Sequence, residues 1–273
     1  MIFSSLLIAS ALCGVVPERD DDFFWENELF GMRAYGPGDR HCWSGFDVFN
    51  KLHGAGSVGD LLREHDKRGN WHTTPSDGIL DNYVVGAGRG VGAIAVRGDG
   101  EWKTYGNWRD ARIIAQGGDF CEFELVYPAF SALGEMTYRI KLEKNSRFFS
   151  NTVSFENELP DGFCAGPGLD VNPARNHDGT LWRDSRSGAA ALFETERGAT
   201  EGVTATGIFI DPADAANVKI ETDAQGCLVL SLRKRSFTYW AGAAWSNAGD
   251  IESFDAWLEC LKNKRNSILE RKR

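Results

Sequence analysis

The sequence predicts one mainly β domain, built as an antiparallel sandwich or barrel. In the stretch from residue 136 to 142 every second residue is apolar, which is the spacing of a strand with one buried face. Similar stretches recur later in the chain, and turns containing Asp-Gly or Gln-Gly separate them. The chain has 273 residues, a length at which all-β sandwiches commonly fold as one unit. The strand-like stretches are EMTYRIKLEK (135–144), TVSFEN (152–157), ATGIFI (205–210), VKIETD (218–223) and CLVLSL (227–232).

Two helices are expected beside these strands. The first covers about 58–65, where residues recur at helical spacing, Ser57 offers an N-cap and Asp60 lies in the first turn. The second lies near the C-terminus, after Asp250 or Ser253, either of which suits an N-cap. The sequence therefore predicts a few peripheral helices around a β domain. The positions that carry the helical spacing are Val58, Leu61, Leu62 and His65, then Phe254, Trp257, Leu258 and Leu261.

The first residues form an apolar run that contains Ala9-Ser10-Ala11, which is similar to the cleavage site of a short export signal. The run lacks the basic residues that usually precede such a signal, so the alternative is a first strand ending at PERDDD (17–22). We expect residues 1–15 to be this signal or strand, and residues 16–273 to form the single domain. Export would place the protein in the periplasm or outside the cell, and the alternative is the cytoplasm. No other stretch approaches the ~20 apolar residues that a membrane span needs.

Charge and cysteine content argue against several classes of partner. The net charge is −9 and the pI is about 5.1, so the chain lacks the basic surface that nucleic acids and anionic membranes attract. The six cysteines are scattered and form no C-x-x-C pair, which argues against a structural zinc site and leaves disulfide pairing open. Of the nine tryptophans, most are expected to pack on sheets and a few to stack on sugar rings. The oligomeric state is not defined by these patterns.

The stretch Gly88–Ala93 reads GRGVGA and fits the dinucleotide-binding pattern G-x-G-x-x-G/A. That interpretation needs a strand before the glycines and a helix after them. Residues 82–85 are expected to form a short strand, but AIAVRGDGEW (93–102) alternates like a second strand and turns at Asp99-Gly100. The glycines are therefore expected to allow a turn or a close backbone approach. Neither a nucleotide nor any other cofactor is predicted.

His72 is the first candidate for acid–base chemistry, because it lies in a polar loop beside Trp71 and five residues before Asp77. Asp81 and Tyr83 are expected to share one side of the following strand, where a tyrosine can also transfer a proton. The alternative for His72 is an ordinary solvent-exposed loop histidine.

Four cations lie beside turn or aromatic residues, where they could meet a substrate carboxylate. Arginine binds a carboxylate bidentately, whereas lysine supplies a point charge. The alternative for each of them is an ordinary surface ion pair. These cations are Arg33, Lys51, Arg89 and Arg109.

The acidic run Asp20–Asp22, with Glu26, lacks the Asp-x-Asp-x-Asp-Gly spacing of a calcium loop. A solvated turn, or contacts with neighbouring arginines, explains the run more simply, and calcium binding there stays open. No metal site is predicted elsewhere, since His65 and His72 lack ligand spacing and the sequence contains no H-E-x-x-H motif.

Five stretches in order carry a family resemblance: PERDDDFFWEN (17–27), RAYGPG (33–38), SGFDVFNK (44–51), WH with DGILDNYVVGAGRGVGAIAV (71–96) and YWAGAAW (239–245). Together they resemble the bacterial family catalogued as domain of unknown function 4861, and the resemblance spans about Val16 to Leu261. It implies a galactose-mutarotase-like β-supersandwich. It also implies oligosaccharides rich in uronic acid and rhamnose, because members occur with unsaturated uronyl hydrolases in polysaccharide-degradation clusters. Members more often carry Gly-Glu-Gly-Leu-Asp where this chain has Ser76–Asp81, which leaves open whether Asp77 takes the role of the missing glutamate.

Two reactions fit this context. In β-elimination a base removes the proton α to a uronate carboxylate, with Arg33 or Lys51 neutralising the carboxylate. In mutarotation a histidine acid and a carboxylate base open the sugar ring. A non-catalytic carbohydrate-binding module is the third interpretation, and the cations favour elimination. The catalytic candidates are His72, Tyr83, Arg33 and Lys51, and the substrate-binding candidates are Trp71, Asp77, Asp81, Arg89, Arg109, Trp240 and Trp245.

Overall fold

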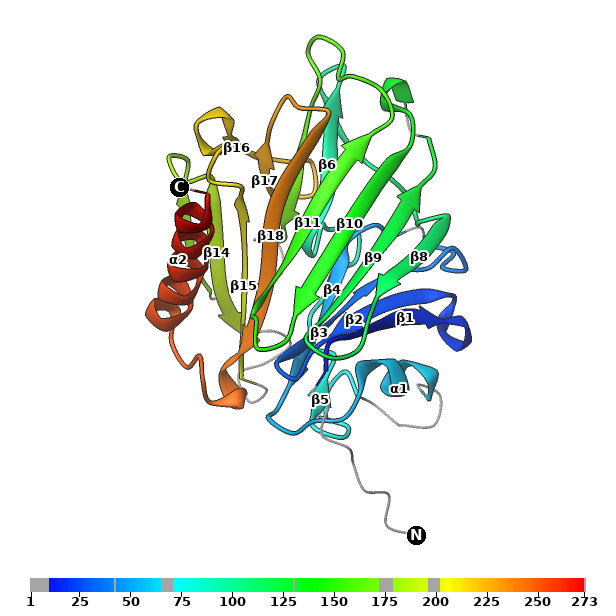
Figure 1. Ribbon diagram of the computed structural model, residues 1–273, viewed down its shortest axis with the longest axis vertical. Coiled ribbons are helices and arrows are strands. Elements are labelled where there is room, and N and C mark those ends of the chain that lie inside the picture. The colour runs from blue at the N-terminus through cyan, green and yellow to red at the C-terminus, as the bar shows by residue number, and fades with distance from the viewer. Residues whose placement is uncertain are drawn as a thin grey trace.

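The computed structural model describes residues 10–41, 43–64, 71–129, 131–171, 179–195 and 202–272. These residues form a mainly antiparallel β-sandwich, as predicted, with one large sheet in front of two smaller ones (Figure 1). Residues 1–9, which include Ala9 and most of the predicted signal or strand, lie outside the described residues, as do His65 and Cys42, one of the six cysteines.

The large sheet has eight strands in the order β13-β14-β15-β18-β11-β10-β9-β8. The alternation predicted from the sequence is confirmed in β10, where Met136, Tyr138, Ile140 and Leu142 are all buried. Its strands are β8 (Asp110–Ala115), β9 (Phe120–Tyr127), β10 (Met136–Glu143), β11 (Phe148–Phe155), β13 (Thr180–Asp184), β14 (Ala189–Thr195), β15 (Val203–Ile210) and β18 (Ser236–Trp245).

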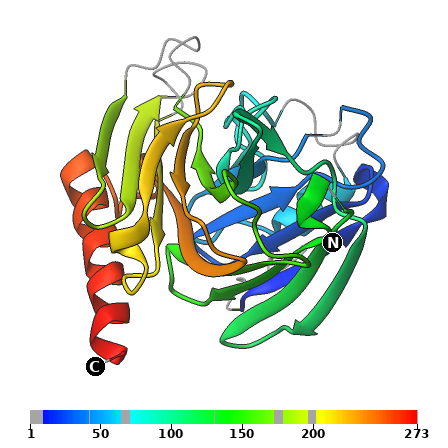
Figure 2. The same cartoon turned by 90° about the horizontal axis from the view of Figure 1, so that it is seen from above.

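Two five-stranded sheets form the opposing layer. The N-terminal sheet runs in sequence order: β1 (Leu12–Val16), β2 (Asp22–Glu26), β3 (Phe30–Ala34), β4 (Phe46–Lys51) and β5 (Ile79–Leu80). The distal sheet has the order β16 (Lys219–Thr222), β17 (Leu228–Ser231), β12 (Cys164–Leu169), β6 (Val91–Gly98) and β7 (Glu101–Thr104). Strands β6 and β7 are the hairpin predicted after the glycines. Viewed from above, the two layers lie face to face (Figure 2).

One hydrophobic core joins all three sheets. Phe23 of the N-terminal sheet packs on Phe123 of the large sheet with ring centroids 4.4 Å apart, and Phe46 lies 5.3 Å from Tyr138. The distal sheet is tied to the same core, because the Ile94 amide donates to the Tyr138 hydroxyl at 2.7 Å. Burial of this apolar surface, at roughly 25 cal/mol per Å², is the main stabilising contribution to the sandwich.

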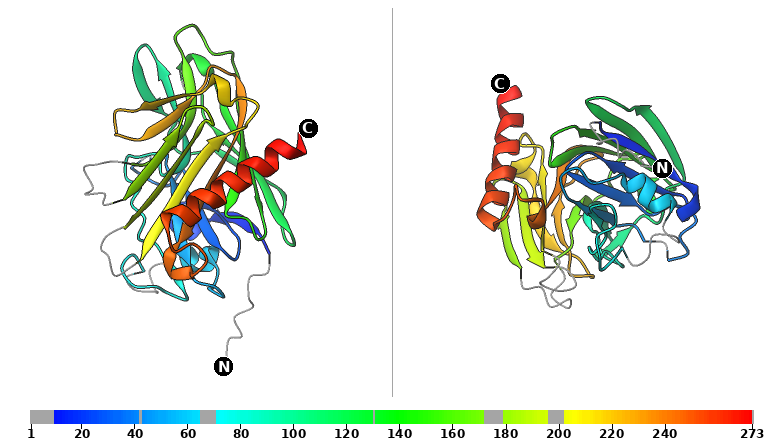
Figure 3. Two further views of the ribbon diagram at one scale, coloured as in Figure 1. Left: turned by 90° about the vertical axis from the view of Figure 1, so that its left-hand side faces the viewer. Right: turned by 90° about the horizontal axis from the view of Figure 1, so that it is seen from below.

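Both predicted helices are confirmed, and both are peripheral. Helix α1 (Val58–Arg63) covers Phe24 and Phe49 on the outer face of the N-terminal sheet, and its N-cap is Ser57. Helix α2 (Phe254–Arg271) lies across the outer face of β14 and β15 (Figure 3). Its N-cap is Ser253, one of the two predicted residues. Neither α-helix of the described segments is long and apolar enough to cross a membrane. Short 3-10 helices lie at Pro17–Arg19, Ser131–Leu133, Ala215–Asn217 and Ser246–Ala248.

The strand expected at residues 82–85 is wrong, because this segment is irregular. Its polar groups are engaged by loop contacts instead of a β-ladder. The Asp81 amide donates to the Trp71 carbonyl at 3.1 Å, and the Asn82 side chain accepts from Asn50 at 2.8 Å. Asp81 and Tyr83 therefore do not share the side of a strand.

The glycine-rich stretch allows a close backbone approach, as predicted. Gly90 has a φ of +54°, and a Cβ there would lie 1.8 Å from the Phe46 carbonyl oxygen. This contact joins the N-terminal sheet to the start of β6.

Candidate functional site

A buried cluster of charges lies on the outer face of the N-terminal sheet, around Arg33 of β3. Antiparallel pairing puts Arg33 opposite Asp47 of β4, and the guanidinium forms an ion pair with that carboxylate. The same guanidinium lies 3.3 Å from Asp22 and 3.7 Å from Asp81. All four side chains are at most 4% exposed. One cation therefore faces three carboxylates in a place from which water is largely excluded.

His72 connects this cluster to the surface. Its Nδ1 lies 3.0 Å from the Asp81 carbonyl oxygen and 3.1 Å from the Asp81 carboxylate. Because both neighbours of Nδ1 are acceptors, the neutral ring keeps its proton on Nδ1 and carries its lone pair on Nε2. The imidazole is 37% exposed, and it stacks on Trp71 with ring centroids 4.8 Å apart. An oriented, accessible histidine of this kind can act as a general base or acid.

Burial changes the proton affinities of the cluster. Burial, together with the charge of Asp81, raises the pKa of Asp47 to about 7, although Arg33 opposes the shift. Burial also raises the pKa of Asp22. Burial alone would lower the pKa of Arg33, but Tyr35 and the carboxylates raise it well above its ordinary value. Near neutral pH, the Asp47 carboxyl can therefore take up or release a proton close to the His72–Asp81 pair.

The raised pKa of Asp47 predicts a pH-dependent stability. The folded protein keeps the proton up to about pH 7, whereas the unfolded chain releases it near pH 4. The stability that this proton contributes is complete below pH 4 and is lost as pH rises to 7. Over that range we expect the free energy of unfolding of wild type to fall relative to that of Asp47→Asn, by at most about 1.4 kcal/mol per pH unit.

Urea unfolding at several pH values between 4 and 8 measures this difference. Asp77→Asn is the matched control, because Asp77 is exposed and its variant should differ from wild type by a constant amount. A wild-type advantage over Asp47→Asn that is constant or grows with pH contradicts the assignment.

Lys51, a predicted catalytic residue, lies on the same face but in a separate ion pair. Its ammonium is 2.7 Å from Glu26 and donates to the Asn27 carbonyl at 3.0 Å, with the Lys51 and Glu26 side chains fully buried. Glu26 also accepts from the Ser57 hydroxyl at 2.6 Å and from the Val58 amide at 2.9 Å. The pair therefore anchors the start of α1 to the sheet, and a substrate does not reach it in this conformation.

Arg89 is likewise engaged within the protein. Its guanidinium lies 2.9 Å from Asp223 and donates to the Gln225 side chain at 2.8 Å. Arg89 and Asp223 are 4% and 0% exposed, so this pair ties the glycine-rich loop to the turn between β16 and β17.

The other predicted residues lie in several different places. Asp77 is in an exposed turn near the His72 loop, and Tyr83 is buried in the core. Arg109 is half exposed and pairs with Asp110 and Glu135, at the edge strand β8. Trp240 stacks on Phe209 on the outer face of the large sheet, and Trp245 is buried at the end of β18. The structure therefore brings together His72, Trp71, Asp81 and Arg33, whereas Arg109 and Trp240 make their contacts on the large sheet.

The sequence interpretation missed Asp47 and Tyr35. In FDVFNK (46–51), Asp47, Phe49 and Lys51 alternate on one face of a strand. A charged residue on the same face as Phe49 is the sequence signal from which a buried partner of Arg33 could have been predicted. The Tyr35 hydroxyl donates to Asp47 at 3.2 Å. Asp22 belongs to the acidic run, and its contact with Arg33 agrees with the expected role in binding a neighbouring arginine.

An aromatic surface that was also missed begins at Tyr35. The Tyr35 ring meets the edge of Trp43 at 5.2 Å, and His41 stacks on Trp43 at 4.9 Å with a 21° angle between the rings. Trp43 is partly exposed and His41 is exposed. This surface borders the Arg33 cluster and could stack on a sugar ring.

The fold and this site define a mainly β sandwich protein with a histidine–aspartate pair over a buried arginine cluster. A sequence profile described as "Domain of unknown function (DUF4861)" matches residues 8–271. The chain therefore belongs to the DUF4861 family, and the family resemblance found in the sequence is confirmed.

The proteins that are similar to this chain include one relative and one solved structure. "Uncharacterized protein P7" of Formosa agariphila is 25% identical to this chain in an alignment 272 residues long, which covers 93% of this chain and 68% of that protein. The crystal structure of the GH36 alpha-galactosidase AgaB from Geobacillus stearothermophilus superposes on 87% of this chain with a TM-score of 0.45 and 11% identity. The chain spans 42% of the length of that enzyme.

Proposed function

We propose that this protein is a carbohydrate-active enzyme that acts on uronate-containing oligosaccharides, with His72 as the residue that transfers the proton. The observation that carries the proposal is the contact between His72 Nδ1 and Asp81, which orients a partly exposed imidazole over a buried, titratable cluster. Trp43 and His41, which adjoin Tyr35 of the Arg33 cluster, would offer a stacking surface for a sugar ring. The family resemblance supports uronate as the substrate class.

The first candidate reaction is β-elimination next to the uronate carboxylate. Nε2 of His72 would take the proton α to the carboxylate, and a group would leave from the β carbon with the electron pair of its bond. The cation expected to neutralise the carboxylate is Arg33 or Lys51, and each of these is already paired with a protein carboxylate. The predicted binding residue Arg89 is paired in the same way. Their charge is therefore less available to a developing enolate than the sequence suggested.

Mutarotation is the second candidate, and this charge balance is the observation that favours it. Opening a neutral sugar ring needs a proton donor and an acceptor but no cation for a substrate carboxylate. His72 and the carboxylate cluster would suit that requirement.

Export, which the apolar first residues suggest, agrees with either reaction, because both would act on fragments of polysaccharides. A cut after Ala11 would leave strand β1 intact.

One experiment compares these reactions. The protein is incubated with rhamnose–uronate oligosaccharides, and absorbance is followed in the band of a C4–C5 double bond conjugated to the carboxylate, with polarimetry on free sugars in parallel. We expect new absorbance if elimination occurs. An optical-rotation change without absorbance would assign mutarotation instead. Binding without turnover of either kind would leave a carbohydrate-binding module and contradict the proposed enzyme.

A further inference from the structure

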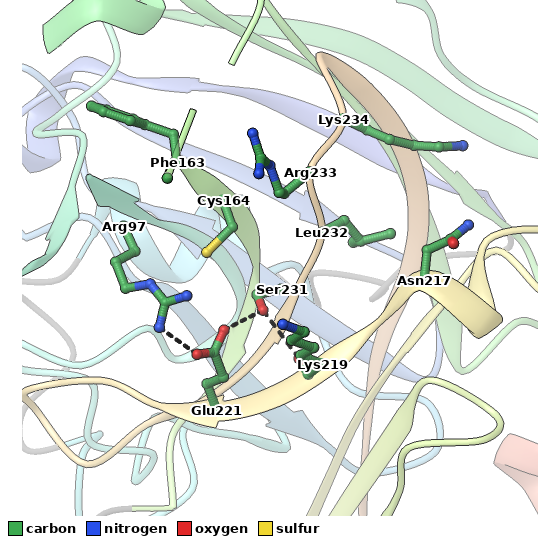
Figure 4. A pocket seen from close by; sticks show the side chains of 11 residues that line it. Arg97, Phe163, Cys164, Asn217, Lys219, Glu221, Ser231, Leu232, Arg233 and Lys234 are labelled. Carbon is green, nitrogen blue, oxygen red and sulfur yellow. Dashed lines mark hydrogen bonds and ion pairs between the residues drawn. The ribbon is translucent and has the colours of Figure 1, made fainter. Parts of the chain in front are cut away.

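A pocket of about 550 Å³ lies in the distal sheet (Figure 4). Strand β6 starts beside Phe46 of the N-terminal sheet and carries Arg97 into this pocket. Arg97 is six residues beyond Val91, which is roughly 20 Å along a strand. In Figure 1, β16 and β17 lie at one end of the sandwich, and β5 and α1 lie at the other. The pocket and the His72 site are therefore separate.

The pocket is basic in a protein that is acidic overall. Its lining contains four basic side chains, Arg97, Lys219, Arg233 and Lys234, and one acidic side chain, Glu221, whereas the whole chain has a net charge of −9. A cluster of positive charges on a protein whose net charge is negative attracts anions to that place.

Within the lining, the one carboxylate is fully engaged. One oxygen of Glu221 accepts from Arg97, and the other accepts from the Ser231 hydroxyl at 2.5 Å (Figure 4). Glu221 and Arg97 therefore neutralise each other, and the charge that faces a ligand comes from the three remaining cations.

Those three cations are available to different degrees. Among the described residues, Lys219 has no carboxylate within ion-pair distance. Arg233 lies 3.0 Å from Asp161, but the Arg233 side chain is 57% exposed and Asp161 is fully exposed, and such pairs contribute little. A ligand carboxylate can replace Asp161 at small cost. Lys234 pairs with Asp214, which is only 14% exposed.

The rest of the lining suits a molecule larger than a simple anion. Leu232 is a buried residue of the lining, and the Phe163 ring is held over Gly98, where a Cβ would come within 2.2 Å of it. Asn217 and Ser231 add hydrogen-bonding groups. Apolar surface combined with a few polar and charged groups is typical of small-molecule sites, and the volume lies within their usual range of roughly 300–1,000 Å³.

We propose that this pocket binds an acidic saccharide, with Lys219 and Arg233 meeting its carboxylate or sulfate groups and Phe163 packing on a sugar ring. The anionic character follows from the charges of the lining alone, whereas the saccharide part rests on the proposed function. An enzyme with such a second site would hold a polyanionic chain at a distance from the residue that reacts.

Calorimetric titration of the full chain tests the proposal. The probes are a galacturonic acid trimer, a sulfated galactose disaccharide, a neutral galactose trimer and inorganic sulfate, at low and at physiological salt. We expect one or both acidic saccharides to bind, more weakly at the higher salt, and the neutral trimer not to bind. Lys219→Gln/Arg233→Gln should weaken this binding at least tenfold.

The control Arg112→Gln/Lys262→Gln removes the same charge from exposed side chains that do not line the pocket, and it should change affinity less than twofold. His72→Gln should also leave pocket binding unchanged. Inorganic sulfate that binds as tightly as the saccharides overturns the saccharide assignment, and absence of binding by every acidic probe overturns the site. Binding that is lost in His72→Gln but kept in the pocket variant places the acidic sugar at His72 alone, which contradicts this inference while supporting the proposed function.

Discussion

Replacing Arg33 by glutamine is expected to lower the free energy of unfolding by about 3–5 kcal/mol, because removing one partner of a buried ion pair leaves uncompensated charge in the interior. Three carboxylates face this guanidinium, and none of the four side chains is more than 4% exposed. Asp47 can relieve part of the strain by keeping its proton, since burial already raises its pKa to about 7. Asp22 and Asp81 would stay buried without the cation that both contact.

Urea unfolding measures this loss, and Arg109→Gln is the matched control. Arg109 is half exposed and pairs with exposed carboxylates, so its replacement should change stability by no more than about 0.5 kcal/mol. Adding Asp47→Asn to Arg33→Gln should recover part of the loss, which a double-mutant cycle will resolve. A cost below about 1 kcal/mol for Arg33→Gln would show that the guanidinium does not hold these carboxylates together.

The second large effect is expected on catalysis. His72→Gln should lower kcat by about 10²–10⁴-fold, the range supplied by a positioned general acid or base, on whichever substrate the assay establishes. The imidazole is 37% exposed, so the free energy of unfolding should change far less than in Arg33→Gln. Loss of activity with retained stability distinguishes a chemical role for His72 from a structural one.

Initial rates and unfolding curves for His72→Gln test this prediction together. His53→Gln is the control, because His53 lies in an exposed turn after β4 and its replacement should leave both quantities near wild type. Full activity in His72→Gln would remove the histidine from the mechanism, and saccharide binding without any turnover in wild type would leave the binding-module interpretation.

The local pattern of the sequence determined the β fold, the two helices and their caps. Period-two apolar residues in β10, and Ser57 and Ser253 before apolar residues at helical spacing, are signals that neighbours in the chain carry by themselves. The same is true of the hairpin β6–β7, since its turn and its alternation lie within a few residues of each other. The five stretches that resemble the family can also be recognised from the sequence alone, because they depend only on residue types and their order along the chain.

Only the tertiary structure decided what the charged residues do. Arg33, Lys51 and Arg89 looked equally available in the sequence, yet each meets a carboxylate from another part of the chain, and for Arg89 that partner is 134 residues away. His72 differs because it remains partly exposed while Asp81 orients it. The physical reason is that a charge changes its role with desolvation and with its partners. Both depend on which distant strands and loops come together, and hydrophobic periodicity carries no information about that.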